Sequence, residues 1–517
     1  MSPVRVLVVG VALIRGLSGQ APRLGSIAFP NSGAAAAQPA FIRGVLLLHS
    51  FEYGSAAAAF QEAERLDPGF AMAYWGEALT YTHPIWNQQD VSAARAALQR
   101  LGPTAAARRA RAPTARERAY LDAVETLYGN GSKAARDTVY SRAMSRLVAR
   151  FPADLDAKVF YAASLLGLNQ GDRDTLTYLR AAALLEQVFR AAPNHPGAAH
   201  LLIHCYDDPA HARLGLPAAR AYATIAPDAP HAHHMTTHIF LALGMWDDVV
   251  AQNEIAAGPD RASWTPTHYT YWLGYGYLQQ GRYDEAWRHL DLVHRNMATG
   301  RGNVPAVVVE MCGDFIVTTE RWDSPCLQWN DIDLSGMKTR DKALGAFLQG
   351  FSALKRGDRA TAERQLANIV AFVPPLRNGE GDRGRGPTAG RDPVPSILEK
   401  ELRGAVLKAS GDARGAVAVL RDAAALEDAM PFEFGPPVTV KPSHELLGEV
   451  LLQTGRPREA EVEFTRALRL APKRTRSLIG LARAAAAAGD QSTAARASAD
   501  LQSIWHAADP GVLATAR

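Results

Sequence analysis

The sequence predicts an all-α protein, built as a solenoid of about a dozen helix–turn–helix units. Ala, Leu, Arg, Glu and Gln dominate the chain, and the alternation of apolar and polar residues that is typical of strands is scarce. Gly and Pro fall at the expected ends of helices. Similar segments also recur along the chain, so its 517 residues indicate one extended array rather than several separate domains.

Two segments show the repeated unit clearly. Residues Ala59–Leu79 read AFQEAERLDPGFAMAYWGEAL, and the stretch from Glu459 reads EAEVEFTRALRLAPKRTRSLIGLARA. Each predicts a helix that ends at a Leu-x-Pro sequence, followed by a second helix with small residues where the two helices cross. The turn inside the unit recurs as GMWDD from Gly244, GRYDE from Gly281 and GRPRE from Gly455. In each turn, glycine ends one helix and an aromatic residue or proline follows two positions later.

This pattern resembles the tetratricopeptide repeat, a helix–turn–helix unit of 34 residues. The resemblance implies a right-handed superhelix, because one unit cannot bury its apolar face alone and must stack against its neighbours. It also implies a concave inner wall, lined by the first helix of each unit. Repeats of this family are usually modules that bind a peptide or protein segment.

The repeat pattern covers residues 41–373 and resumes over residues 394–517, after an N-terminal extension at residues 22–40. Residues 374–393 are rich in Gly, Arg, Asp and Pro, and a segment of this composition cannot bury apolar surface, so we expect a flexible surface loop there. The aromatic, Pro-rich stretch at residues 431–444 is instead expected to fold back over another part of the protein.

The first 21 residues resemble a secretory signal peptide. Arg5 precedes a short apolar run, and small residues follow that run. The run is too short to span a bilayer, which needs about 20 apolar residues, and no other run in the sequence is long and apolar enough. We therefore expect a periplasmic or secreted protein without a membrane span. Cys312 and Cys326 are candidates for a local disulfide in such a compartment, or else they are small buried residues.

Most of the 15 histidines lie in a His-rich centre at residues 195–272. Two pairs, His200/His204 and His234/His238, have a spacing of four residues, which places both rings of a pair on one face of a helix. The two pairs are 34 residues apart, and equivalent positions in neighbouring repeats lie side by side. Four imidazoles are therefore expected to converge near a carboxylate. The predicted ligands of a divalent transition metal are His200, His204, His234, His238 and Asp207.

Ligands of this kind suit zinc, iron, copper or manganese, and their spacing does not select among these metals. An alternative is a polar groove in which the same His and Asp side chains form hydrogen bonds to a peptide or a carboxylate ligand. Asp207 is also a candidate for a helix cap.

A second set of residues is predicted to line the groove beside the histidine centre. His49 and His83 are again 34 residues apart, which predicts that they lie together, and an aromatic run follows His268. Such a run is also typical of the packed core of a repeat. The predicted groove residues are His49, His83, His268, Tyr271 and Trp272.

Several functional classes are disfavoured. The net charge is only +4 and no long Lys/Arg block is present, which argues against nucleic-acid binding. The sequence lacks HExxH, GxSxG, GxxxxGK[ST] and a GxGxxG at a strand–helix junction, so neither a zinc peptidase nor a nucleotide cofactor is supported. The sequence predicts an exported scaffold whose groove engages a peptide or protein. The alternative is a metal-dependent hydrolase or oxidoreductase built inside the superhelix, and a third possibility is a structural metal that rigidifies the middle repeats.

Overall fold

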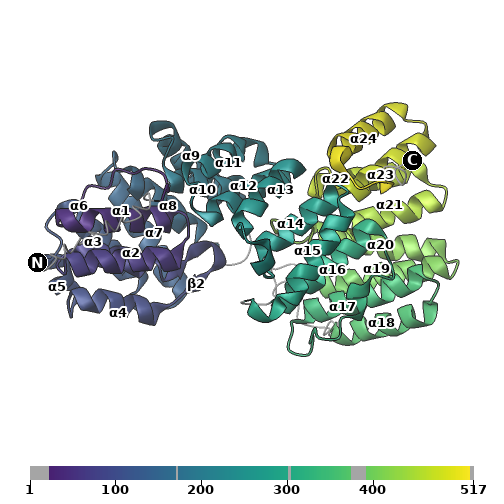
Figure 1. The fold of residues 1–517 in the computed structure, drawn as a ribbon, viewed down its shortest axis with the longest axis horizontal. Coiled ribbons are helices and arrows are strands. Elements are labelled where there is room, and N and C mark those ends of the chain that lie inside the picture. The colour runs from purple at the N-terminus through teal and green to yellow at the C-terminus, as the bar shows by residue number, and fades with distance from the viewer. Residues whose placement is uncertain (1–21, 170–172, 301–303, 374–391, 513–517) are drawn as a thin grey trace, which may run out of the picture.

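The computed structural model describes residues 22–169, 173–300, 304–373 and 392–512. Helices make up most of these residues and stack one after another into a superhelix (Figure 1). The predicted all-α solenoid is therefore confirmed. The predicted signal peptide, and nearly all of the predicted loop at residues 374–393, lie outside the described residues.

Successive helices pair as antiparallel hairpins, which are the units of the repeat. The pairs are α1 (Gln38–His49) with α2 (Tyr53–Leu66), α3 (Ala71–Leu79) with α4 (Val91–Leu101), α6 (Ala115–Leu127) with α7 (Lys133–Arg150), α8 (Leu155–Leu166) with α9 (Thr175–Ala191), α10 (Pro196–Tyr206) with α11 (Ala212–Ile225), α12 (Pro230–Ala242) with α13 (Trp246–Ala257), α14 (His268–Gln279) with α15 (Tyr283–Arg295), α17 (Thr339–Lys355) with α18 (Arg359–Phe372), α19 (Val394–Ala409) with α20 (Ala413–Asp428), α21 (Ser443–Gln453) with α22 (Pro457–Leu470), and α23 (Thr475–Ala488) with α24 (Gln491–Ile504).

Two helices depart from this pairing. α5 (Ala105–Ala110) is a short extra helix before α6, and α16 (Val304–Thr319) is followed by a loop instead of a partner helix. The loop contains a short 3-10 helix, Pro325–Gln328, and a disulfide between Cys312 and Cys326 ties it to α16. Of the two alternatives for these cysteines, the structure contains the disulfide. A two-stranded antiparallel hairpin, β1 (Thr82–His83) with β2 (Gln88–Gln89), interrupts the helices after α3.

Glycine and phenylalanine produce the close packing between helices. Phe60 on α2 fits between Gly44 of α1 and Gly76 of α3, where an added Cβ atom would come within 2.8 Å and 2.3 Å of its ring. Phe464 on α22 packs in the same way against Gly480 of α23, where the corresponding distance is 2.1 Å. One aromatic ring therefore fills the space that small residues leave between adjacent hairpins, near both ends of the chain.

The N-terminal extension contacts several repeats before α1 begins, and its Phe29 is buried against Phe41, Trp75 and Tyr120. Its Arg23 backbone N–H donates to Asp228 Oδ2 (2.7 Å), and Ser26 N–H donates to the Asn194 carbonyl oxygen (3.1 Å). Further along, Ser32 Oγ donates to Glu117 Oε1 (2.7 Å). The extension thereby connects the loop before α12 and the loop before α10 to α6.

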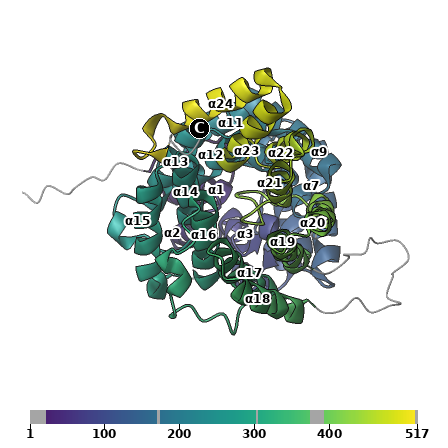
Figure 2. The same cartoon turned by 90° about the vertical axis from the view of Figure 1, so that its right-hand side faces the viewer.

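The last hairpins pack back against the middle of the chain. Trp505 Nε1 donates to the Gln279 carbonyl oxygen at the end of α14 (3.0 Å), and Trp246 Nε1 on α13 donates to the Lys473 carbonyl oxygen (3.2 Å). A single apolar core joins residues from α8 to α16 with residues of α23 and α24. Seen along the long axis, the helices from α14 to α24 surround the middle of the molecule (Figure 2). The superhelix therefore closes on itself.

Residues 431–442 cross the interior of this closed turn without regular secondary structure. Gly435 lies against the Trp272 ring of α14, and Val440 packs against Gly313 of α16. Thr439, Val440 and Lys441 are buried. The expectation that this stretch folds back over another part of the protein is thus confirmed, and we call residues 431–442 the inner segment.

A fully buried ion pair holds the inner segment in place. Arg474, at the start of α23, donates from Nε to Glu445 Oε2 (2.9 Å), from Nη2 to the Val440 carbonyl oxygen (3.0 Å) and from Nη1 to the Tyr275 hydroxyl (3.0 Å). Lys441 Nζ donates to the second oxygen of Glu445 (3.0 Å). Although burial raises the pKa of Glu445, the charges of Arg474 and Lys441 outweigh it and hold that pKa well below its ordinary value.

Among the helices that the structure describes, none combines the length and the apolar character that crossing a bilayer requires.

We predict that Arg474→Met strongly destabilises the protein. Removing Arg474 takes away the cation that bonds Glu445 Oε2 and leaves Lys441 as the remaining cation on this buried carboxylate. Breaking a buried pair in this way typically costs about 3–5 kcal/mol. The midpoint of urea unfolding measures this loss, and the double variant Arg474→Met/Glu445→Gln should recover part of it.

The matched control is Arg456→Met, because Arg456 pairs with Glu459 on the surface. An exposed pair contributes about 0–1 kcal/mol, so this variant should unfold close to the wild type. Equal midpoints for Arg474→Met and Arg456→Met would contradict the structural role of the buried pair.

Candidate metal centre

The histidines of the centre come from two helices that are equivalent in neighbouring repeats. α10 and α12 both begin with proline at their first position, Pro196 and Pro230, and the predicted 34-residue register therefore holds in the structure. The four predicted rings lie in one continuous cluster of aromatic contacts, in which the His204 and His238 ring centres are 5.9 Å apart. The cluster nevertheless divides into two groups, and one of them includes a histidine that was not predicted.

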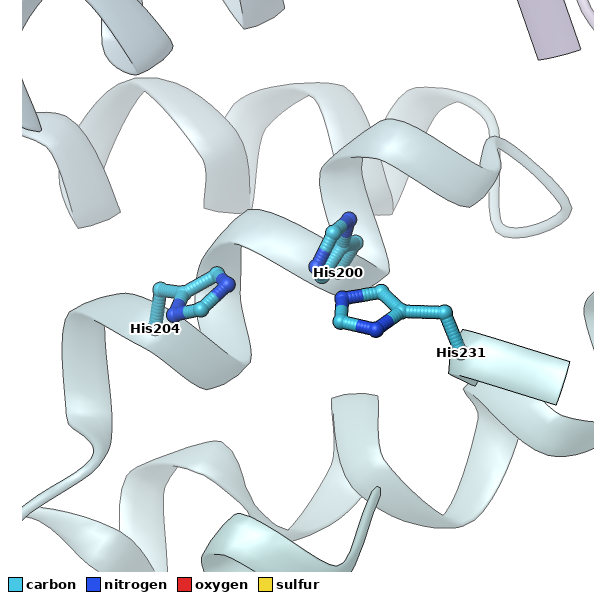
Figure 3. A group of neighbouring side chains, drawn as sticks. All are labelled: His200, His204 and His231. Atoms are coloured by element: carbon cyan, nitrogen blue, oxygen red, sulfur yellow. The ribbon is translucent and has the colours of Figure 1, made fainter. Parts of the chain in front are cut away.

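The first group consists of His200, His204 and His231. His200 and His204 point from α10 toward His231 at the start of α12 (Figure 3). One ring nitrogen from each lies within 4.8 Å of the others, and the three side chains are 0%, 4% and 6% exposed. Among the described residues, none is a hydrogen-bond partner for the buried Nε2 atom of any of the three rings. Each ring thus has a buried nitrogen without a partner, and the three rings offer nitrogens close enough together to bind one ion. We call these residues the three-histidine group.

Two contacts orient the rings of the three-histidine group. His200 Nδ1 lies 2.7 Å from the His49 carbonyl oxygen, which can only accept, so this nitrogen carries the proton and Nε2 keeps a free lone pair. His231 Nδ1 lies 3.0 Å from the Tyr269 hydroxyl. Burial lowers the pKa of His200 to about 3, and burial also lowers the pKa values of His204 and His231 well below the ordinary value. The group is therefore neutral in the absence of a cation.

The second group is the pair His234 and His238, whose Nε2 atoms are 3.2 Å apart. His238 Nδ1 donates to Asp207 Oδ2 (2.5 Å), since a carboxylate can only accept. His234 Nδ1 lies 2.9 Å from Asn253 Oδ1. We call His234 and His238 the histidine pair.

The orientation of the Asn253 amide is fixed by its surroundings. Asn253 Nδ2 donates to the Val249 carbonyl oxygen (3.1 Å) and to Thr237 Oγ1 (3.3 Å), so Oδ1 is the atom that faces His234. His234 must then donate from Nδ1. In the neutral form, both members of the histidine pair carry their proton on Nδ1, and two Nε2 lone pairs face each other.

The predicted groove residues occupy different places around these groups. His268 is exposed at the start of α14, and its ring centre is 4.4 Å from that of His234. Trp272 covers the histidine pair, with ring centres 4.4 Å from His238 and 4.9 Å from His234. Tyr271 points away and donates its hydroxyl hydrogen to Asp314 Oδ2 (3.0 Å), so it belongs to the repeat interior rather than to the histidine centre.

His49 and His83 do not form the pair that their spacing predicted. His49 Nε2 donates to Asp156 Oδ1 (2.9 Å), and its ring stacks on Phe160. His83 lies on β1, four residues beyond the end of α3, and its ring stacks on Tyr53 at 3.9 Å. The prediction was wrong because α3 stops at Leu79, so the helical register does not extend to His83.

His49, Asp156 and His195 form a separate buried cluster with potential metal ligands. His49 Nε2 donates to Asp156 Oδ1, and His195 Nδ1 accepts from the Ala198 backbone at the start of α10 (3.4 Å). His195 Nε2 is buried without a hydrogen-bond partner among the described residues, and it lies 3.4 Å from the same Asp156 oxygen. The cluster fixes His49, whose carbonyl oxygen in turn orients His200. We therefore assign it a supporting role.

Two phenylalanines enclose the centre from opposite ends of the chain. Phe51, in the turn between α1 and α2, has a positive φ of 54°, and its ring centre is 4.3 Å from that of His200. Phe434 of the inner segment lies 5.1 Å from the His238 ring. A cavity of about 170 Å³ lies beneath the inner segment, and Asp207 and His238 form part of its wall. The centre is thus enclosed rather than lining an open groove.

Sequence reasoning missed His231 and Phe51. His231 is three residues before His234, which is also a same-face spacing on a helix, so a signal was present. Phe51 comes close to His200 only through a contact between α1 and α10. No local pattern encodes that contact.

We predict that Gly197→Ala destabilises the protein, because the added methyl group collides with His49, which supports the histidine centre. An added Cβ would lie 2.4 Å from His49 Nδ1 and 2.9 Å from Val159, and His49 is held by Asp156. Overpacking of this kind costs about 1–3 kcal/mol. This destabilisation exceeds the stabilisation that the higher helix propensity of alanine provides.

Gly54→Ala is the matched control for this substitution in urea unfolding. Gly54 is likewise the second residue of its helix, α2, but no atom lies within 4 Å of its added Cβ. This variant should be neutral or slightly stabilised. Equal unfolding midpoints for the two variants would contradict the prediction, because they would show that a methyl group fits between α10 and His49.

Comparison with known proteins identifies one repeat directly. The tetratricopeptide repeat model matches residues 442–474, which contain α21 and α22. No curated protein matches the chain. Among solved structures, yeast Tom70 is similar at 13% identity and a TM-score of 0.36, covering 88% of this chain and 96% of that one.

Two further solved structures have comparable similarity. The Cut9 and Hcn1 complex of the APC/C matches at 12% identity and a TM-score of 0.30, with 94% of this chain and 97% of that chain covered. The human IFIT1 dimer with m7Gppp-AAAA matches at 13% identity and a TM-score of 0.34, with coverage of 92% and 91%. At this level the similarities carry no functional argument. The chain thus contains a tetratricopeptide repeat within a larger all-α superhelix.

Proposed function

We propose that this chain is an exported metal-dependent enzyme, whose metal is bound inside the superhelix by His200, His204 and His231. The observation that carries the proposal is a set of three neighbouring histidines whose buried Nε2 atoms have no hydrogen-bond partners among the described residues and whose ring nitrogens lie within 4.8 Å of one another. Buried polar atoms are nearly always paired, so three such atoms at one point call for a missing partner. A cation that accepts three lone pairs meets this requirement.

The donor set defines the class of metal. Three neutral imidazoles suit zinc, copper or iron, whereas manganese prefers oxygen ligands. The contact between His200 and the His49 carbonyl oxygen is the kind of second contact that orients a metal-binding histidine. Three protein ligands leave a coordination position open, as in catalytic rather than structural sites. An open position allows a hydrolase to activate water or an oxidoreductase to bind a small oxidant.

Protein binding is the general function that tetratricopeptide repeats suggest, and it is the second candidate here. The prediction from the sequence is more specific and places a peptide or protein segment in the concave groove. In this chain the inner segment already occupies the interior of the closed turn, with Val440 packed on Gly313 and Gly435 on Trp272. A partner would therefore have to displace the inner segment or bind to another surface, which favours an enclosed small-molecule site.

The disulfide supports the export part of the proposal. Disulfides persist in oxidising compartments and are rare in the cytosol, and Cys312–Cys326 fixes the loop that replaces a partner helix for α16. The remaining cysteine, Cys205, is buried, and burial raises the pKa of its thiol. It is therefore not a reactive partner for the other two.

We predict that protein purified without a His tag contains zinc, copper or iron, and that the double variant His200→Ala/His231→Ala loses the metal from the three-histidine group. Elemental analysis of the folded protein measures the content. His294→Ala is the control, because His294 stacks on Trp329 in another part of the chain and should leave the metal content unchanged.

An added anion distinguishes an enzyme site from a structural one. Azide should change the visible absorption of the Co²⁺- or Cu²⁺-loaded protein if a coordination position is open. A loaded protein that ignores azide would indicate a structural metal. A protein that never binds metal would exclude the enzyme and favour the scaffold.

We also predict that the chain made in its native cell carries one free thiol and one disulfide. After unfolding without reductant, maleimide should label one cysteine, and after reduction it should label three. Mass spectrometry counts the labels. A version lacking residues 1–21 and retained in the cytosol is the control and should show three labels without reduction. Three free thiols in the native cell would contradict export.

A further inference from the structure

We propose that the centre binds a second metal ion, held by the Nε2 atoms of His234 and His238. This inference rests on the proposed function, because it places the second ion beside the one in the three-histidine group.

The geometry of the histidine pair is that of two ligands on one ion. Two nitrogens at about 2.0–2.1 Å from a tetrahedral metal are about 3.3 Å apart. The two Nε2 atoms are 3.2 Å apart, and both rings are buried, at 0% and 4% exposure. An ion between them would therefore need little movement of either side chain.

The hydrogen bonds behind the histidine pair also match those of a metal site. Asp207 accepts from His238 Nδ1, which forms the carboxylate–histidine arrangement that commonly orients a metal ligand. Asn253 accepts from His234 Nδ1 and is itself fixed by the Val249 carbonyl oxygen. Both rings are thus held with their free lone pairs directed at one point.

The competing explanation is a proton shared between the two Nε2 atoms. Because both Nδ1 atoms already donate, such a proton makes the pair an imidazolium with a full positive charge. Trp272 and Phe434 cover this site, with ring centres 4.4 Å and 5.1 Å from that of His238, and among the described residues Asp207 is the one carboxylate placed against the pair. A divalent ion satisfies both lone pairs without requiring that protonation.

Further ligands and access are available on both sides of the pair. His268 is exposed and its ring centre is 4.4 Å from that of His234. His204 of the three-histidine group is the member that faces the pair, with its ring centre 5.9 Å from that of His238. The cavity beneath the inner segment reaches His238 and Asp207. The second ion would therefore be the one that a small molecule meets first from that cavity.

The test counts metal ions in the full chain after chelator treatment and reloading with Zn²⁺ alone. We expect two equivalents in the wild type and one each in His231→Ala and His238→Ala. The control, His294→Ala, should retain two. Circular dichroism and thermal melting establish that each variant is folded.

A second, less disruptive variant tests the same site if His238→Ala does not fold. Asp207→Asn keeps the size of the side chain but weakens the orientation of His238, and loss of such a contact raises a metal dissociation constant by about 10–100-fold. We expect this increase for one of the two equivalents, with the other unchanged.

The possible results separate the two proposals. Suppose that the wild type binds one equivalent of Zn²⁺, which His231→Ala loses and His238→Ala keeps. This result would overturn the second ion and retain the first. One equivalent lost in both variants would indicate a single shared ion and would also overturn it. No bound Zn²⁺ in the wild type would overturn both proposals.

Discussion

Arg474 carries its charge at a position with no exposed surface, and three other parts of the chain supply its partners. Glu445 comes from α21, the Val440 carbonyl from the inner segment and the Tyr275 hydroxyl from α14. A charge can be buried only where its partners are held firmly. The pair therefore requires α21, α23 and α14 to meet around the inner segment, and this meeting closes the superhelix. With Val440 fixed, the chain just before it is held near Trp272 and His238.

The histidine centre lies where an early and a late part of the chain meet the middle repeats. Phe51 reaches it from the first hairpin, whereas Phe434 reaches it from the inner segment. The enclosure excludes water from rings whose hydrogen bonds direct Nε2 toward shared points, in His200, His234 and His238. Closure of the superhelix and burial of these ring nitrogens are therefore linked, since an open solenoid would expose the same rings to water and supply their nitrogens with partners.

The repeat and much of the site could be predicted from the sequence because both depend on local periodicity. The 34-residue register placed His200 with His234 on equivalent helices, and the small residues marked where Phe60 and Phe464 pack. His83 lay beyond this reasoning because the helix ended before it. The closure could not be predicted either, because contacts such as that of Trp505 with Gln279 join residues far apart in the chain and leave no periodic signal.

The inner segment is held unequally along its length. Its last residues, Thr439 to Lys441, are buried and bonded to Glu427 and Glu445, but Phe432 and Phe434 are 37% and 44% exposed. Local opening is easiest where few buried contacts must break. The loosely held half is also the half that covers His238. Displacing it would leave the Arg474 pair intact, so this half of the inner segment can open while the superhelix stays closed.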